Sequence, residues 1–365
     1  MRGGDLAARL GGDEFIVMLP GLGRDPEIAY SRSSSIAKRI QESLCQAYHV
    51  QDSELHITPS IGIAIYPEQG ESSDDILKHA DAAMYESKSS GRNQVSLFSP
   101  SMQMKADERL ELEKELRSAI AGERLTLHYQ PQLTCNNRII GFEALVRWHH
   151  PVHGMIPPSK FISVAEESGL IFSLGEWVLA TAPAQTPKGV AMELLPPDTT
   201  SAINVSAHQF HRPEFTELAK HILHTAQVDP HHIKLELTES VIVDDVPGTI
   251  TRMNELQQIG VQFALDDFGT GYSSLSYLRQ LPINQLKIDQ SFIQHINHNH
   301  EDKVIAETII GMSQSLKMDI IAEGVEEEEQ LKILQELGCD TYQGYLYSPA
   351  VSAGEATVML QSQSC

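Results

Sequence analysis

From Leu125 to Tyr347, short apolar runs typical of β-strands alternate with segments of helical periodicity. Short apolar runs between turn residues indicate buried strands, and apolar residues three or four apart indicate helices. The eight strand candidates are Leu125–Tyr129, Ile139–Arg147, Ser201–Val205, Ile233–Leu237, Gln262–Leu265, Gln285–Ile288, Asp319–Ala322 and Thr341–Leu346. Eight strands with intervening helices predict an α/β fold, a (β/α)8 barrel of the TIM type, with its active site at the carboxyl ends of the strands.

Polar side chains recur at or near the ends of these predicted strands. They are Glu143, Asn204, Glu236, Glu239, Asp266, Asp267, Lys287, Asp289, Glu323, Glu326 and Gln343. Any one of them alone is more simply a surface residue, but random placement rarely puts a polar residue at the same point of successive strand units. In a barrel these side chains would converge on one mouth.

The stretch Phe263–Ser274, FALDDFGTGYSS, sets two adjacent acids at the end of a strand. Because strand side chains alternate between faces, Asp266 and Asp267 meet one site only if the backbone turns, and the glycines that follow permit a turn. A surface turn with two solvated acids is the simpler alternative for this stretch alone. Carboxylate and amide oxygens are the ligands that Mg²⁺ and Mn²⁺ prefer, and two such ions would clamp a phosphodiester and activate water.

The motifs in this region occur in a fixed order. They are Glu143-Ala144-Leu145 with Arg147, then ELTE from Glu236, DDFGTGYSS from Asp266, KID from Lys287, EGVE from Glu323 and QGY from Gln343. From about Arg109 to Val358 this series resembles the EAL family of cyclic di-GMP phosphodiesterases. The resemblance implies hydrolysis of one phosphodiester of this bacterial second messenger to linear pGpG, with two Mg²⁺ or Mn²⁺ ions.

The resemblance also implies a role for each matching residue. The implied metal ligands are Glu143, Asn204, Glu236, Asp266, Asp267 and Glu323. Lys287 would position the attacking water, Glu323 would assist proton transfer, and Asp266 would bridge the ions. The implied substrate contacts are Gln130, Arg147, Gln343 and Asp289, the last of which could instead stand beside the metal ligands. Glu239 and Glu326 would hold the metal ligands in position without binding the ions themselves. The resemblance also implies that the chain forms a homodimer.

The first hundred residues carry a different set of motifs. A β-hairpin is predicted over Asp5–Leu19, with Gly11 and Gly12 near its turn. Gly11 to Phe15, the SIGIAIYP stretch from Ser60 and ADAAMYESKSSGRNQV from Ala80 resemble the GGDEF family of diguanylate cyclases. Arg2 and Asp5 match the RxxD motif of that family, which implies an inhibitory nucleotide site for GTP or cyclic di-GMP.

The cyclase-like segment is predicted to be a partial α+β domain over residues 1–99. No DxDxFKxxND-like segment, which carries another metal-binding acid in that family, occurs in the chain. A two-metal cyclase needs all its metal ligands. We therefore expect a truncated domain that is either regulatory or inactive. Residues 100–121 are predicted to be a linker helix or the first helix of the barrel domain, which we place at residues 109–362.

Composition excludes several classes of function. The 27 Lys and Arg residues against 49 Asp and Glu residues give a formal net charge of −22, which disfavours binding to a nucleic-acid polymer. The four cysteines form no close pair, no apolar run reaches membrane-spanning length, and no signal peptide is recognisable. These features predict a cytoplasmic protein.

Three alternatives remain open from the sequence. The first is a cyclase or a bifunctional protein, which the missing N-terminal half of the cyclase-like domain disfavours. A catalytically silent cyclic di-GMP sensor would keep the fold without turnover. A zinc or nickel site is conceivable at two histidine groups, although solvated loop histidines are the simpler interpretation; the groups are His149, His150, His153 and His295, His298, His300.

Pro183 and Pro187 fall where the family has a helix, and because an interior proline costs roughly 3 kcal/mol we expect a shortened or broken helix on the outer wall over residues 181–200.

Overall fold

The computed structural model describes residues 4–23, 25–50, 53–66, 72–122, 124–185, 199–241, 245–269 and 278–363. The chain divides into two compact units, Met1–Leu112 and Glu113–Cys365, and helix α3, Pro100–Ala121, runs through the division. Among the helices described, none combines the length and apolar content needed to cross a bilayer.

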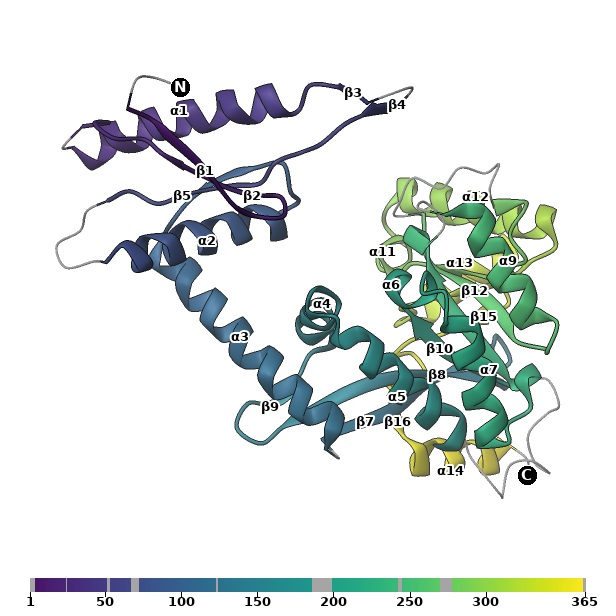
Figure 1. The fold of residues 1–365 in the computed structure, drawn as a ribbon. Coiled ribbons are helices and arrows are strands. Elements are labelled where there is room, and N and C mark those ends of the chain that lie inside the picture. Colours follow the sequence, from purple (N-terminus) through teal and green to yellow (C-terminus); the bar gives the residue numbers. More distant parts are fainter. Residues whose placement is uncertain are drawn as a thin grey trace. The chain divides into compact units, whose positions relative to one another are not determined.

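The second unit is built on a closed barrel of eight strands (Figure 1). In order around the barrel they are β7 (Leu125–Thr134), β8 (Ile139–His150), β10 (Thr200–Val205), β11 (Ile233–Thr238), β12 (Gln262–Phe268), β13 (Gln285–Ile288), β14 (Asp319–Ala322) and β15 (Thr341–Tyr342). Neighbours from β8 to β15 pair in parallel. The predicted barrel is therefore confirmed, and each of the eight predicted strands corresponds to one of these.

Strand β7 departs from a uniform (β/α)8 barrel because it runs antiparallel to both β8 and β15. Only residues 135–138 connect β7 to β8, and Asn137 has a positive φ of 59° there. So short a connection makes an antiparallel hairpin, whereas a parallel crossover needs a dozen or more residues. The reversal places Gln130 of β7 directly opposite Glu143 of β8.

Helices cover the outer face of the barrel (Figure 1). They are α4 (Pro158–Ser168), α5 (Leu170–Gln185), α6 (Ala207–Phe210), α7 (Phe215–Ala226), α9 (Val246–Gln257), α11 (Gln290–Ile293), α12 (His300–Leu316), α13 (Glu328–Leu337) and α14 (Ala353–Gln363), with a 3-10 turn at Pro230–His232. Helix α7 buries Phe215, Ala219, Ile222 and Leu223 at helical spacing. Short strands β9 (Gly154–Ile156) and β16 (Val351–Ser352) add to β8 and β7.

Helix α5 contains one of the two prolines expected to interrupt the outer wall. Pro183 lies in its last turn, and the helix continues to Gln185. Pro187 lies outside the described residues. The described part of α5 thus accommodates Pro183 without ending there.

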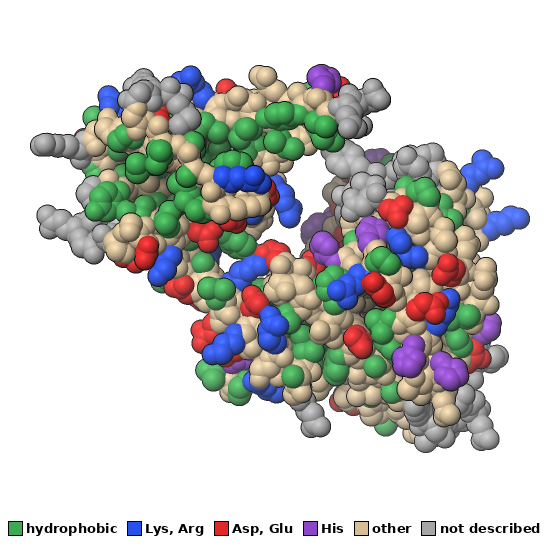
Figure 2. Space-filling model, in the orientation of Figure 1, with side chains coloured by type: hydrophobic (Ala, Val, Ile, Leu, Met, Phe, Trp, Pro, Cys, Tyr) green, Lys and Arg blue, Asp and Glu red, His purple; other side chains and the backbone are tan. Residues whose placement is uncertain are grey.

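The first unit consists of small sheets and two helices besides the start of α3. Its elements are β1 (Leu6–Gly11), β2 (Glu14–Met18), α1 (Pro26–Leu44), β3 (Tyr48–Val50), β4 (Ser53–Leu55), β5 (Ile61–Ile63), α2 (Ser73–Ser89) and β6 (Val95–Leu97). The strands pair as β1–β2, β3–β4 and β5–β6. Apolar side chains of the first hairpin stay exposed, including Leu10 at 64% and Phe15 at 67%, and Figure 2 shows hydrophobic side chains gathered over this unit.

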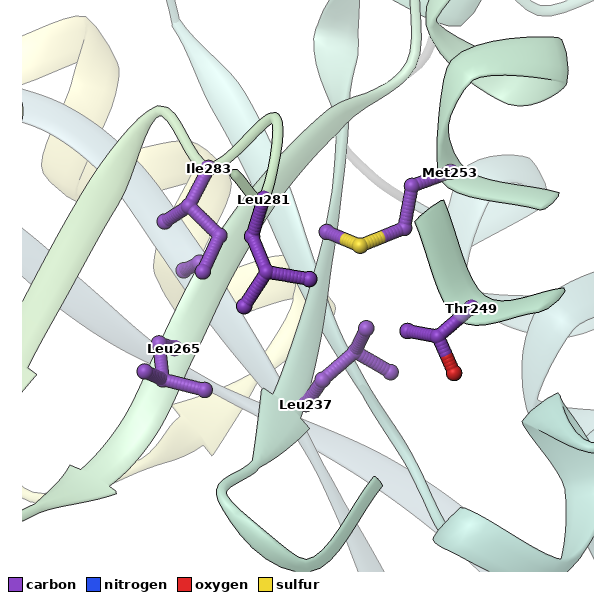
Figure 3. A pocket seen from close by; sticks show the side chains of 7 residues that line it. Leu237, Thr249, Met253, Leu265, Leu281 and Ile283 are labelled. Carbon is purple, nitrogen blue, oxygen red and sulfur yellow. The ribbon is translucent and has the colours of Figure 1, made fainter. Parts of the chain in front are cut away.

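A small apolar void of about 10 Å³ lies against the outer side of β11 and β12 (Figure 3). Its lining is Leu237, Thr249, Met253, Ala264, Leu265, Leu281 and Ile283. A space of this size holds one water at most, and the apolar lining offers it few hydrogen-bond partners. None of the predicted site residues lines it, so we interpret it as a packing imperfection.

The contact between Gly344 and the segment after β14 gives a test of this packing. A Cβ on Gly344 would lie 2.0 Å from the Val325 carbonyl oxygen and 2.4 Å from its nitrogen. We expect Gly344→Ala to lower the free energy of unfolding by about 2 kcal/mol or more, because backbone atoms cannot yield as a flexible side chain does. Urea unfolding measures the effect.

Gly354→Ala in α14 is the matched control, since a Cβ there meets nothing within 4 Å. We expect it to leave stability unchanged or to raise it by less than about 1 kcal/mol. Equal effects of the two substitutions would contradict the packing described.

Candidate active site

Six predicted site residues lie on successive strands of the barrel. They are Glu143 on β8, Asn204 on β10, Glu236 on β11, Asp266 on β12, Lys287 on β13 and Glu323 directly after β14. The parallel register places Asn204 beside Glu236 and Thr238 beside Asp266. Because alternate residues of each strand point inward, these side chains meet inside the barrel toward the carboxyl ends of the parallel strands.

Lys287 lies at the centre of this group, with a fully buried side chain. Its Nζ is 2.6 Å from Glu236 Oε2, 2.6 Å from Glu323 Oε1 and 3.0 Å from Asp266 Oδ1. Glu143 Oε2 lies 3.8 Å from the same nitrogen. One ammonium group is therefore shared by four carboxylates, and the site carries an excess of negative charge.

Amide side chains hold Glu143 from its other side. Asn204 Nδ2 donates to Glu143 Oε1 at 2.6 Å, and Gln343 Nε2 donates to Glu143 Oε2 at 2.5 Å. Gln343 also donates to Gln130 Oε1 at 3.0 Å and accepts from Gln132 Nε2 at 3.0 Å. Gln343 is 4% exposed, and its amide group forms hydrogen bonds with Glu143 and with neighbouring glutamines.

Both adjacent acids lie within β12, where the register with β13 shifts between Leu265 and Phe268, so the backbone irregularity that the sequence required occurs inside the strand and not at the glycines after it. Asp267 has a positive φ of 53°, and its backbone N–H donates to Asp266 Oδ1 at 3.0 Å. Asp266, Asp267 and Glu323 each place a carboxylate oxygen within 4.8 Å of the others. Glu239 Oε1 accepts the N–H of Gly269 at 2.9 Å, which holds the backbone directly after β12.

The pKa values follow from burial and from crowding of like charges. Burial raises the pKa of Glu323 to about 8, with contributions from Asp266 and Glu143 and against the effect of Lys287. Partial burial raises the pKa of Asp267 to about 6, and the negative charges of Asp266 and Asp289 add to the shift. Burial likewise raises the pKa of Glu236 well above its ordinary value.

Two groups are held in their charged forms despite burial. Burial alone would lower the pKa of Lys287, but the surrounding carboxylates raise it well above its ordinary value. Burial alone would raise the pKa of Glu143, but Lys287 and the two amide donors hold it below its ordinary value. The surroundings therefore favour the charged forms of Lys287 and Glu143, whereas the raised pKa values of Glu236, Asp267 and Glu323 favour their protonated forms.

The donor set fits hard divalent cations. Glu236 Oε1 and Glu239 Oε2 are buried and have no hydrogen-bond partner in the part of the chain that the structure describes. Buried carboxylate oxygens without partners are costly, and an oxygen-only set suits Mg²⁺ or Mn²⁺ better than zinc or copper. Across the described ranges, the group of Asp266, Asp267 and Glu323 is the only one of its kind, so the histidine groups do not gather as ligands.

The remaining predicted residues lie around this centre or away from it. Arg147 is half-buried on β8, where burial lowers its pKa and Tyr345 and Glu143 oppose the shift. Asp289 caps α11 by accepting the backbone N–H and the hydroxyl of Ser291. Glu326 has an exposed side chain, and its backbone N–H donates to Gln330 at 2.8 Å. Asp5 lies at the start of the first hairpin, and Arg2 lies outside the described residues.

Three buried polar residues of the barrel interior were not among the predicted site residues. Gln132 is 1% exposed, Lys234 is 7% exposed and Gln285 is 4% exposed. Each lies two residues from a recognised site position on the same strand, namely Gln130, Glu236 and Lys287. The period of two along a strand was the signal that could have identified them.

Two family models match the chain. The model described as EAL domain matches residues 113–350, and the model described as Diguanylate cyclase, GGDEF domain matches residues 1–94. Among solved structures, the one described as PaMucR Phosphodiesterase, c-di-GMP complex is 39% identical with a TM-score of 0.65, and the match covers 67% of this chain and 99% of that one.

Curated relatives are similar over nearly the whole chain. The Bifunctional diguanylate cyclase/cyclic di-GMP phosphodiesterase MucR of Pseudomonas aeruginosa is 41% identical over 347 residues, which are 95% of this chain and 50% of MucR. The Cyclic di-GMP phosphodiesterase NbdA of the same organism is 37% identical over 350 residues, 95% of this chain and 44% of NbdA. The chain thus spans about half the length of the curated relatives it matches.

The raised pKa of Glu323 predicts how the stability of the metal-free protein depends on pH. Its pKa is about 8 in the folded state against an ordinary value of 4.5, so the folded state binds this proton more tightly. The stability that the group contributes is complete below pH 4.5 and is lost as the pH rises through about 8. We expect the free energy of unfolding in EDTA to fall between about pH 5.5 and about pH 8.

The comparison is with Glu323→Gln, which cannot titrate at this position. Urea unfolding of both proteins at the two pH values isolates the contribution of Glu323 from that of other groups. A decrease in the wild-type protein no larger than that in the variant would contradict the assignment.

Proposed function

This chain belongs to the EAL domain family, and we propose that it hydrolyses one phosphodiester of cyclic di-GMP to linear pGpG with two Mg²⁺ or Mn²⁺ ions. The observation that carries the proposal is the buried Lys287 ammonium among four carboxylates, together with two buried carboxylate oxygens that have no partner among the described residues. The names of the relatives MucR and NbdA, and the cyclic di-GMP in the PaMucR structure, support this substrate.

The proposed metal ligands are Glu143, Asn204, Glu236, Asp266, Asp267 and Glu323. Bound there, the ions would supply Lewis acidity that lowers the pKa of a water and offsets charge on the phosphodiester. Asn204 suits this set because its Nδ2 is turned to Glu143, which leaves its carbonyl oxygen available as a ligand. Asp266 is the proposed bridging ligand.

Lys287 and Glu323 are the proposed catalytic pair. The Lys287 ammonium is fixed among the proposed metal ligands, so it can orient a water that is bound there. Glu323 Oε1 lies 2.6 Å from the Lys287 nitrogen, so its carboxylate is placed to take a proton from a water that Lys287 orients. Glu239 is proposed to hold the loop after Asp267 through Gly269.

Substrate contacts are proposed for Gln130, Arg147, Asp289 and Gln343. Arg147 and Gln130 keep partly exposed side chains near Glu143, where they can reach an anionic ligand. The burial of Gln343 against Glu143 supports a positioning role for it as well. Glu326, whose side chain is exposed, stays a predicted supporting residue.

The GGDEF segment is proposed to be regulatory rather than catalytic, in a homodimer. Asp13 and Glu14 lie at the turn of the β1–β2 hairpin and, within the residues described, belong to no group of three potential metal ligands. Arg2 and Asp5 are the proposed inhibitory nucleotide site, for GTP or cyclic di-GMP.

Turnover of cyclic di-GMP tests the proposal directly. Purified protein with Mg²⁺ is expected to produce pGpG, and EDTA is expected to stop the reaction, because the carboxylates alone cannot activate water at neutral pH. Product analysis by liquid chromatography distinguishes the outcomes. Binding of cyclic di-GMP without turnover at saturating Mg²⁺ would favour a silent sensor instead.

Substitution of Asp266 tests the assignment of the metal ligands. We expect Asp266→Asn to lower kcat by about 100-fold or more, since one neutral amide oxygen replaces a bridging carboxylate. Asp340→Asn, at an exposed residue preceding β15, is the matched control and should keep kcat within about twofold. Near-full activity of Asp266→Asn would show that the ligand set is wrong.

Lys287→Met separates water positioning from substrate binding. We expect kcat to fall by about 100-fold or more with little change in KM, because Lys287 would act on the water rather than on the nucleotide. Steady-state kinetics at saturating Mn²⁺ gives both constants. An effect confined to KM would contradict this role.

A further inference from the structure

A second buried lysine lies in the barrel interior, one layer below Glu236. Lys234 precedes Glu236 by two residues on β11, so both side chains leave the strand on the same face, with their origins about 7 Å apart. Lys234 is 7% exposed, and its Nζ donates to Gln285 Oε1 at 2.9 Å. Neither residue has a role in the site as described so far.

The Lys234–Gln285 bond crosses the inside of the barrel. Strand β12 separates β11 from β13 in the sheet, so a side chain of β11 reaches β13 only through the interior. Ala264 of β12 is the register partner of both Glu236 and Gln285, and its small side chain leaves room for the crossing. Gln285 precedes Lys287 by two residues, so Lys234 and Gln285 form a layer beneath Glu236 and Lys287.

Charges alternate in sign through these layers. Burial lowers the pKa of Lys234, the negative charges of Glu236 and of Asp319, at the start of β14, oppose that shift, and the positive charge of Lys287 adds to it. Lys287 in turn contacts Glu236 and the acids around it. The series Asp319, Lys234, Glu236, Lys287 therefore runs from the amino end of β14 toward the acidic mouth.

We propose that Lys234 is a positioning residue that acts through Glu236, where its charge weakens the binding of divalent cations and leaves the loaded site with a surplus positive charge. This inference rests on the proposed function. When bound ions keep all five ionised, the acids Glu143, Glu236, Asp266, Asp267 and Glu323 would balance Lys287 plus two divalent ions. Lys234 adds one positive charge to this neutral set, which matches the single negative charge of the phosphodiester to be cut.

A purely structural role for Lys234 makes a different prediction. If the side chain only filled space, methionine would do so without burying a charge and would leave cation affinity unchanged or weakened. If Lys234 acts through its charge, its removal strengthens cation binding. The direction of the change in affinity separates the two explanations.

The experiment is calorimetric titration of the EDTA-stripped full chain with Mn²⁺. We expect Lys234→Met to lower the Kd for Mn²⁺ on the order of tenfold, since a unit charge is removed from the low-dielectric region beneath the ions. Gln285→Glu should also lower the Kd, because it keeps the bond to Lys234 while neutralising its charge. Lys332→Met, at an exposed residue of α13, removes the same charge from the surface and should leave the Kd within about twofold.

Each outcome bears on the proposal. Tighter Mn²⁺ binding by both Lys234→Met and Gln285→Glu supports it, and if Lys234→Met fails to unfold cooperatively, Gln285→Glu decides alone. Unchanged or weaker binding by the folded variants, or no Mn²⁺ binding by the wild-type protein, overturns it. Tighter binding in a chain that does not hydrolyse cyclic di-GMP would refute the proposed function and leave the role of Lys234 in cation binding intact.

Discussion

The site depends on the ammonium group of Lys287 buried among carboxylates. An isolated charge in a protein interior is costly, and removing one partner of a buried ion pair leaves the other uncompensated. Here one cation faces Glu236, Asp266 and Glu323 at 2.6 to 3.0 Å, so negative groups outnumber the positive one, and the pKa values of Glu236 and Glu323 are raised. The closed barrel makes this arrangement durable, because each of these side chains comes from a different strand segment that neighbouring strands hold in register.

The reversed strand β7 supplies the neutral side of the site. The charged residues come from the parallel strands, whereas Gln130 and Gln132 come from the antiparallel one. Their amides and that of Gln343 form a chain of donors and acceptors that ends on Glu143. Amides do not titrate in the accessible pH range, so they fix the direction of the Glu143 carboxylate without adding to the charge that cations must neutralise.

The sequence predicted the barrel because its signals were local and repeated. An apolar run with a polar residue near its end marked each parallel strand. The barrel topology then brings together the side chains of Glu143, Asn204, Glu236, Asp266 and Lys287. The reversal of β7 also has a signal in the sequence, since the short connection that contains Asn136 and Asn137 allows only a hairpin. The apolar runs do not show strand direction, so the reversal was not predicted from them. Lys234 and Gln285 lie near strand starts, so a polar residue at a strand end does not identify them; only their spacing of two residues from Glu236 and Lys287 places them on the inward face.

Closure of the sheet also explains why the two units differ in their exposed apolar surface. In the barrel every strand has two neighbours, so both edges of each strand are paired and the interior is sealed. In the first unit, the strands described pair only two by two, and Leu10 and Phe15 of the first hairpin remain more than half exposed. Two-stranded sheets bury little apolar area and are marginal on their own. The barrel therefore provides the rigidity that a precise arrangement of charges requires, and the chemistry of the chain is concentrated where the sheet is closed.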